Sequence, residues 1–357
     1  MIELQFLRFC LGSGPEIHLR NVKEWESVFY FCKKHSLVGI GFSGLEKLPH
    51  EHNIPQKLLF QWFALVQQIE ARNKLLNQRC VEIQKLFSEA GFKSCILKGQ
   101  GNAIMYPNPC RRQSGDIDIW VEGDRNAIVN FVVSKTPNVI EQYHHIDFPI
   151  MKDVPIEVHF RPSYTNIFWY NNRLQNYFRD NRGQQFVNYI MLPDSIGRLC
   201  VPTIEFNVVF QMSHMMRHFM SEGIGFRQLV DYYYLLIELH KGSSPQVDYT
   251  LLFKRLGLLK FAQGVMWIVK ESLGINEECL IVEPCEGVGR LLLKEILSTG
   301  NFGHHDKRVA KKLKSKSLTL SLIAKNVSFI KEFPLESLLS PVMGMWMWYG
   351  YKKVHLC

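Results

Sequence analysis

The sequence lacks any long uninterrupted hydrophobic run. The apolar stretch VPTIEFNVVFQM is interrupted by Glu205 and Asn207, and PVMGMWMWYGY near the C-terminus is too short to cross a bilayer. The first residues, MIELQFLRFCLGSGPEI, lack the basic segment and the cleavage site of a secretory signal. We therefore expect a soluble, cytoplasmic protein without a membrane partner.

A cysteine pairing pattern is also absent. The nine cysteines are scattered without CxxC or other paired spacing, which predicts reduced thiols rather than a secreted disulfide scaffold. Negative charge is the scarcer sign, because 33 Asp and Glu stand against 42 Lys and Arg, for a formal net charge of +9. This surplus suits an anionic partner such as a nucleotide, a nucleic acid or an acidic surface, without choosing among them.

The composition is that of a globular protein, and the first and last parts of the chain have helical patterns. The 357 residues are 46% hydrophobic and 21% charged, which allows a full core and two domains. Residues 21–90 show helical periodicity, and within 55–90 Pro55 suits a helix start and Gly91 a stop. From about residue 190, successive amphipathic segments separated by Gly, Ser or Pro predict further helices.

The middle of the chain alternates between strand and helix patterns. FKSCILK (92–98), DIDIWV (116–121) and VPIEVHF (154–160) predict strands, residues 123–135 predict a helix, and residues 138–151 predict one or two more strands. We therefore predict an α+β fold with a small mixed β-sheet. The expected division is an N-terminal helical segment (1–90), a sheet-containing core (91–195) and a helical C-terminal domain (196–357), with the last boundary near LPDSIGR.

Two carboxylates interrupt the strand in SGDIDIW. On a strand, Asp116 and Asp118 point to one face and lie roughly 6–7 Å apart. Such a pair repels itself unless a cation lies between, and oxygen ligands suit Mg²⁺ or Mn²⁺. Glu157, in the alternating strand IEVHF, is a third acid that joins them if the two strands are neighbours. Three acids can hold two metal ions about 3.5–4 Å apart for phosphoryl displacement. The competing interpretation is a chance DxD that faces solvent on an edge strand.

The segment LKGQGNAIMYPNPCRRQSGDIDIWV resembles the nucleotidyltransferase superfamily with the polymerase-beta-type core, and more closely its uncharacterised nucleotidyltransferase family. SHMMRHF and GFRQLVDYYYLL resemble the C-terminal half of that family, so the resemblance covers about residues 55–270. It implies that Asp116, Asp118 and Glu157 are the catalytic and metal-binding acids. It also implies a nucleoside triphosphate (NTP) substrate, with Mg²⁺ or Mn²⁺ as the cofactor.

The phosphate-binding turn departs from the family pattern. Lys98 and Gly99 stand where the family has its Gly-Ser or Gly-Gly turn, but Gln100 and Gly101 replace the usual serine. Backbone N–H groups of residues 99–101 can still bind a triphosphate, and Lys98 can neutralise it. Arg111 and Arg112 are further candidates for bidentate phosphate contacts. The structural alternatives are a solvated strand end for Lys98 and a solvated loop for the two arginines.

Several other polar residues have weaker functional interpretations. His159 can orient Glu157, contact phosphate or act as an acid, although a histidine that fills the sheet face is favoured. His214 and His218 have HxxxH spacing without a third zinc ligand, so a polar seam between the two halves is favoured over a metal site. Arg227 and Asp231, four residues apart, predict an ion pair on their helix.

Two segments near the C-terminus each have a purely structural and a functional interpretation. The basic run KRVAKKLKSKS (307–317) is either a solvated helix face or a surface for nucleic acid or an acidic partner. The aromatic residues Trp346, Trp348, Tyr349 and Tyr351 are more plausibly part of a packed helix than a base-stacking platform.

The combined expectation is a metal-dependent nucleotidyltransferase that moves a nucleoside monophosphate from an NTP to a hydroxyl acceptor and releases pyrophosphate. The acceptor is not identified, and charge slightly favours RNA or protein. Two other classes stay open. One is a non-catalytic binding protein that retains the fold, which the missing serine favours. The other is a metal-dependent phosphohydrolase, which clustered Asp, Glu and His would also serve.

Overall fold

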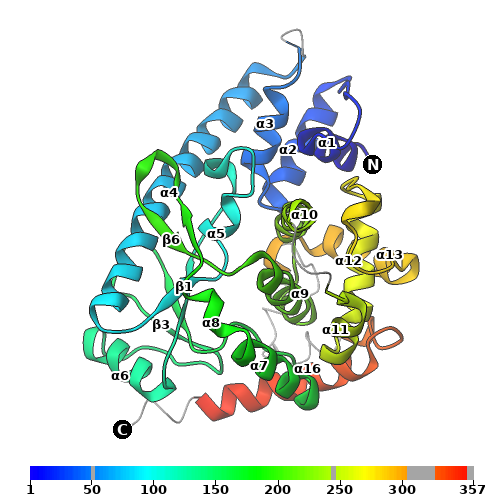
Figure 1. Cartoon of the computed structure of the whole chain (residues 1–357). Helices are drawn as coiled ribbons and strands as arrows, with labels where there is room; N and C mark the ends of the chain where they lie inside the picture. Colours follow the sequence, from blue (N-terminus) through cyan, green and yellow to red (C-terminus); the bar gives the residue numbers. More distant parts are fainter. Residues whose placement is uncertain (50–52, 243–246, 304–325, 352–357) are drawn as a thin grey trace.

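The computed structural model describes residues 1–49, 53–242, 247–303 and 326–351. A small mixed sheet lies between the long helix α4 (Gln56–Glu89) and a group of C-terminal helices (Figure 1). The predicted α+β fold class is confirmed. Across these ranges, no helix is both long and apolar enough to cross a membrane. The basic run at 307–317 lies outside the described residues.

The helices before the sheet are α1 (Ile2–Leu11), α2 (Val22–Lys34), α3 (Val38–Leu45) and α4. The predicted helix at 55–90 is confirmed. It begins directly after Pro55, and it ends ahead of Gly91, whose φ of +82° a residue with a Cβ rarely adopts. Asn21 caps α2 by accepting a hydrogen bond from the backbone N–H of Glu24 at 3.1 Å.

The sheet has the order β1-β2-β4-β3. Its strands and the helices among them are β1 (Ser94–Ile96), α5 (Gln100–Ala103), η1 (Pro109–Arg111), β2 (Ile117–Val121), α6 (Arg125–Lys135), β3 (His145–Asp147) and β4 (Ile156–His159). β2 and β4 are parallel, whereas β1 and β3 run antiparallel to their neighbours. Each of the predicted strands is therefore present in this sheet. Asp124 caps α6 by accepting from the N–H groups of Asn126 and Ala127.

A second, two-stranded sheet lies where the sequence predicts a boundary. The segment contains α7 (Phe168–Asp180), α8 (Arg182–Gln185), β5 (Tyr189–Met191), η2 (Pro193–Ser195) and β6 (Arg198–Cys200). LPDSIG forms the hairpin turn, in which Asp194 and Ser195 have φ values of 57° and 54°. Sequence analysis did not predict this hairpin, and the domain boundaries stay predictions.

The C-terminal helices are α9 (Ile204–Met220), α10 (Phe226–Lys241), α11 (Tyr249–Leu256), α12 (Leu259–Glu271), η3 (Glu277–Cys279), α13 (Glu286–Thr299), η4 (Asn301–Gly303) and α16 (Pro334–Tyr351). Thr203 caps α9, and Asp248 caps α11. The aromatic residues predicted to belong to a helix near the C-terminus fall within α16.

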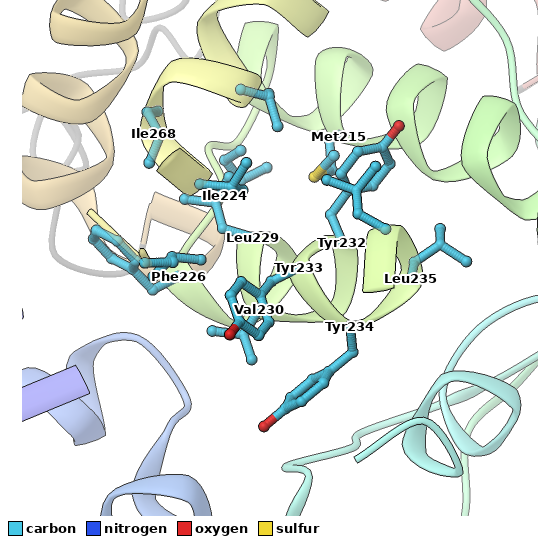
Figure 2. Packing of buried hydrophobic residues seen from close by; sticks show 14 of the residues in the cluster. Met215, Ile224, Phe226, Leu229, Val230, Tyr232, Tyr233, Tyr234, Leu235 and Ile268 are labelled. Atoms are coloured by element: carbon cyan, nitrogen blue, oxygen red, sulfur yellow. The ribbon is translucent and has the colours of Figure 1, made fainter. Parts of the chain in front are cut away.

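The buried apolar residues form two clusters. One lies between the sheet, α4 and α6, and contains Phe87, Ile119 and Val132. The other joins the N-terminal helices to the C-terminal ones, from Phe6 in α1 to Phe333 near the start of α16. Figure 2 shows part of the second cluster around α10. Because α4 contributes to both clusters, it connects the sheet to the helical part.

Candidate active site

A row of three carboxylates crosses the sheet. Asp118 in β2 lies opposite Glu157 in the parallel strand β4, and Asp147 in β3 lies opposite the same glutamate. Residues directly opposite on paired strands share a face. Asp116 lies two residues before Asp118, just ahead of β2, and the two charges interact. The structure thus brings the three predicted acids together and adds Asp147, which sequence analysis missed.

Asp118 is enclosed by two basic side chains. Its side chain is only 1% exposed, with Lys98 Nζ 3.1 Å from Oδ2 and His159 Nε2 3.0 Å from Oδ1. Burial opposes the charged form, but the charge of Lys98 and the hydrogen bond with His159 hold the pKa of Asp118 far below its usual range. Burial likewise opposes a charged Lys98, yet attraction to Asp118 raises its pKa above the ordinary value. The carboxylate is therefore ionised and paired with an ammonium group.

The other acids of the site are more exposed to solvent than Asp118. Asp116 is half-buried, and repulsion from Asp118, followed by burial, raises its pKa. The Glu157 side chain is 32% exposed. Burial would raise the pKa of Glu157, but its hydrogen bond with His159 holds that pKa below the ordinary value. Asp147 is 42% exposed, and burial followed by repulsion from Glu157 raises its pKa. The acids therefore crowd like charges on a face that a cation can reach.

Histidines flank the acidic row. His145 lies opposite His159, and its Nδ1 is 3.4 Å from Glu157 Oε2 and 3.1 Å from His144 Nε2. Burial, followed by the charge of His159, lowers the pKa of His145 to about 4. Ligand atoms of Asp118, Glu157 and His159 lie within 4.8 Å of one another, as do those of His145, Asp147 and Glu157. The sequence signal that was overlooked is HID, a His-x-Asp alternation that pairs with Glu-x-His in IEVH.

The turn after β1 lies next to Asp116, and part of its hydrogen-bonding capacity is already used within the protein. Gly99 has a φ of 60°, and a Cβ at this position would lie 3.6 Å from the carbonyl oxygen of Asp116. The turn therefore lies directly beside the aspartate pair. The backbone N–H of Gly101 already donates to the carbonyl of Lys98. The Gln100 side chain is buried and donates to Asn77 in α4, so it is not directed at the carboxylates.

The structure does not bring the two arginine guanidinium groups to the acids. Arg111 forms ion pairs with Glu46 and Glu70 on the N-terminal helices. Arg112 is buried and makes two 2.7 Å contacts with the carboxylate of Asp231 in α10. Both side chains therefore hold the loop that leads into β2, because a buried guanidinium needs a fixed acidic partner.

Several helix-borne polar residues form a seam against the sheet. His214 Nε2 lies 3.3 Å from Lys98 Nζ, and His218 Nδ1 lies 3.0 Å from Glu222. The first contact joins α9 to the end of β1, as the seam interpretation requires. The predicted ion pair within α10 is wrong, because Asp231 is held by Arg112 instead. Arg227 donates to the backbone carbonyl of Gln113.

A polar cavity of about 450 Å³ continues the same face of the sheet. Trp120, which lines it, lies two residues beyond Asp118 in β2, and Arg161, which also lines it, lies two residues past the end of β4 at His159. Its other walls carry amide and basic side chains from α7 and α8, among them Asn171, Gln175 and Arg182. The acids of the row do not line this cavity, which begins two residues farther along the chain. It combines hydrogen-bond donors with the carboxylate of Glu122.

His159→Gln is expected to lower stability by about 1–3 kcal/mol at pH 6 in metal-free buffer, because buried hydrogen bonds to carboxylates are lost. The carboxylate bonds raise the pKa of His159 despite its burial. A raised folded-state pKa stabilises the protein fully below the unfolded value of about 6.5, and that contribution fades as pH rises through the folded value. Urea unfolding of both proteins from pH 5.5 to 9 measures this. A difference that grows with pH would contradict the assignment.

Comparison with known proteins identifies the family to which this chain belongs. A family described as uncharacterised nucleotidyltransferases matches residues 21–274. The chain is similar to the crystal structure of an antigenic nucleotidyltransferase-like protein from Paracoccidioides brasiliensis, with 10% identity and a TM-score of 0.33, over 63% of this chain and 97% of that one. A search of curated proteins finds no significant match. Because the family match spans well over half of the chain, the protein belongs to the uncharacterised nucleotidyltransferase family.

Proposed function

We propose that this protein is a metal-dependent nucleotidyltransferase that transfers a nucleoside monophosphate from an NTP to a hydroxyl group. The observation that carries the proposal is the register of β2 and β4, which sets Asp118 opposite Glu157 with Asp116 two residues away. Membership in the nucleotidyltransferase family supports the same reaction. A phosphohydrolase would need a water-activating role for these acids that no observation favours.

The donor set fits a hard divalent cation. Asp116, Asp118 and Glu157 supply carboxylate oxygens, the ligands that Mg²⁺ and Mn²⁺ prefer. Lys98 and His159 lie against Asp118 and keep this carboxylate ionised, so it can bind a cation that displaces Lys98. The bound metal would neutralise the triphosphate and lower the pKa of the acceptor hydroxyl.

The residues of the chain have distinct roles in the proposed transfer. The acceptor oxygen forms a bond to the α-phosphorus, and the bond from that phosphorus to the bridging oxygen breaks, so pyrophosphate leaves. Glu157, exposed and ionised, takes the proton of the acceptor hydroxyl. The Lys98 ammonium stabilises the charge that develops on pyrophosphate. Gly99 lets the backbone turn pass close to Asp116 and the phosphates.

The polar cavity beside the row is the proposed acceptor side. Its arginine and amide lining suits an acceptor that carries phosphate, as the 3′ end of an RNA does. The formal charge of +9 favours the same class. A protein hydroxyl is the alternative acceptor, and the experiment below distinguishes the two.

Incubation with each α-labelled NTP, with and without Mg²⁺, tests the proposal. Total RNA and cell extract protein are supplied in separate reactions, and pyrophosphate is measured in parallel. Label in RNA or in a protein band, with equal pyrophosphate and a strict metal requirement, is the expected result. Release of free nucleoside monophosphate or inorganic phosphate without a labelled acceptor would replace the proposal with hydrolysis. Nucleotide binding that is indifferent to Mg²⁺ would indicate a non-catalytic protein.

Lys98→Met is expected to change two affinities in opposite directions. Binding of the Mg²⁺–NTP complex should weaken roughly 10–100-fold, because a charge-assisted phosphate contact is worth about 1.5–3 kcal/mol. Mg²⁺ alone should bind more tightly, since the ammonium 3.1 Å from Asp118 no longer competes with it. Calorimetry with and without nucleotide measures both affinities. The same change in both would show that Lys98 only supports the fold.

A further inference from the structure

A second group of possible metal ligands lies at the rim of the acidic row. Here His145 and Asp147 from β3 meet Glu157 from β4, and the three side chains share one face because their strands are paired in register. His145 Nδ1 lies 3.4 Å from Glu157 Oε2, and His145 Nε2 lies 3.7 Å from Asp147 Oδ1. Two ligands bound to one metal ion lie roughly 3.0–3.5 Å apart when each bond is about 2.1 Å long. Because an imidazole presents only one nitrogen to a given ion, the 3.7 Å between His145 Nε2 and Asp147 Oδ1 is the spacing that bears on a shared ion. One ligand atom from each of the three residues lies within 4.8 Å of the others.

We propose that His145, Asp147 and Glu157 form a second binding site, which shares Glu157 with the proposed nucleotide site, for a borderline divalent transition-metal ion such as Zn²⁺ or Mn²⁺. The mixed ligand set carries the choice of ion, because imidazole nitrogen favours these metals over Mg²⁺, which prefers oxygen alone. Three protein ligands with the two carboxylates 42% and 32% exposed leave a coordination position open to water or substrate.

The surroundings of His145 support this site. The residue is 4% exposed, and within the described part of the chain its Nε2 atom makes no hydrogen bond. A buried ring nitrogen without a hydrogen bond is costly unless something binds it. The other nitrogen, Nδ1, lies 3.1 Å from His144 Nε2, which can fix the ring orientation as outer partners of metal-bound histidines do.

The neighbouring combinations are less suited to hold this ion. In the set of Asp118, Glu157 and His159, the Lys98 ammonium lies on Asp118 where both side chains are mostly enclosed, so an ion bound there must first displace Lys98. Both ring nitrogens of His159 already have partners. Nε2 contacts Asp118, and Nδ1 lies 3.4 Å from the carbonyl oxygen of Arg161. The His145 set is the one with two exposed carboxylates and a ring nitrogen free of hydrogen bonds.

Pulsed electron paramagnetic resonance of Mn²⁺ added to metal-free protein tests the site without nucleotide. The expected spectrum contains ¹⁴N modulation from a bound imidazole, and one equivalent of Zn²⁺ removes this signal whereas excess Mg²⁺ does not. His145→Gln should abolish the modulation, and Asp147→Asn should weaken this Mn²⁺ binding at least about tenfold. His159→Gln is the matched control and should retain the modulation.

The outcomes separate this site from the proposed nucleotide site. Asp116→Asn should lose Mg²⁺-dependent nucleotide binding but keep the ¹⁴N signal. Absence of ¹⁴N modulation in the wild type would overturn the inference, as would its survival in His145→Gln or its loss in His159→Gln alone. Asp147 is exposed, so its variant tests the site even if His145→Gln unfolds. A normal signal with no nucleotide transfer would remove the proposed function and leave this site intact.

Discussion

Asp116→Asn should abolish nucleotidyl transfer while leaving the metal-free protein at least as stable as the wild type. Metal stabilisation of the transition state is worth several kcal/mol, so loss of this ligand should lower the rate by roughly 10³-fold or more. In the metal-free fold, however, repulsion from Asp118 raises the pKa of Asp116 above its ordinary value. A raised carboxyl pKa means that the charged form opposes folding at neutral pH, so neutral asparagine relieves that repulsion.

Asp118→Asn separates the two effects. It should lose transfer equally, but it should also destabilise the protein, because Lys98 and His159 lose an ionised partner. Asp153→Asn, which removes a half-exposed aspartate paired with Arg79, is the matched control and should retain transfer. Steady-state transfer and urea unfolding in EDTA are measured for all variants. Transfer by Asp116→Asn within tenfold of the wild type would refute the assigned metal role.

Asp231→Asn should give the second large effect, a loss of about 3–5 kcal/mol of stability, because a buried guanidinium is left without its counter-ion. The Arg112 and Asp231 side chains are 4% and 5% exposed, and their contacts are 2.7 Å long. Tyr106 also donates its hydroxyl to Asp231. The loop held by this pair continues into Asp116, so transfer should fall as well.

A triple variant tests the physical reason for that loss. Arg112→Met, Asp231→Leu and Tyr106→Phe together remove the charges and the hydroxyl, and should recover most of the stability. Asp153→Asn again serves as control, since an exposed pair contributes about 0–1 kcal/mol. Urea midpoints and slopes give the free energies of unfolding. If the triple variant is no more stable than Asp231→Asn, shape rather than an unpaired charge determines the loss.

The parts of the fold that sequence analysis predicted are those with strong local patterns. The 55–90 helix has a sustained apolar stripe and clear ends at Pro55 and Gly91, and the family motif placed the strands that carry the acids. The β5–β6 hairpin was missed because LPDSIG resembles an ordinary linker. Its left-handed residues Asp194 and Ser195 are not the glycines that usually announce such a turn.

The structure groups the predicted acids with Lys98, whereas the two predicted arginines pair with acids elsewhere. A period of two along a strand fixes which carboxylates share a face, so Asp118 and Glu157 required only that their strands be neighbours. The position of an arginine side chain depends on which carboxylate it pairs with, and that carboxylate can lie far away in the sequence. Arg112 pairs with a residue 119 positions away, and Arg111 with one 65 positions earlier. No local pattern contains such information, which is why both arginines were expected at the phosphates.

The apolar cluster shared by the first and last helices bears on the order in which the chain folds. Phe6 and Trp25 lie in the same cluster as Val265 and Phe329, and the Ser13 hydroxyl donates to the backbone of Leu273. During synthesis, α1–α3 leave the ribosome long before these partners exist. Contacts with such sequence separation form slowly, and the waiting helices expose apolar surface. The N-terminal helices therefore complete their packing only after the chain has been synthesised through Phe329.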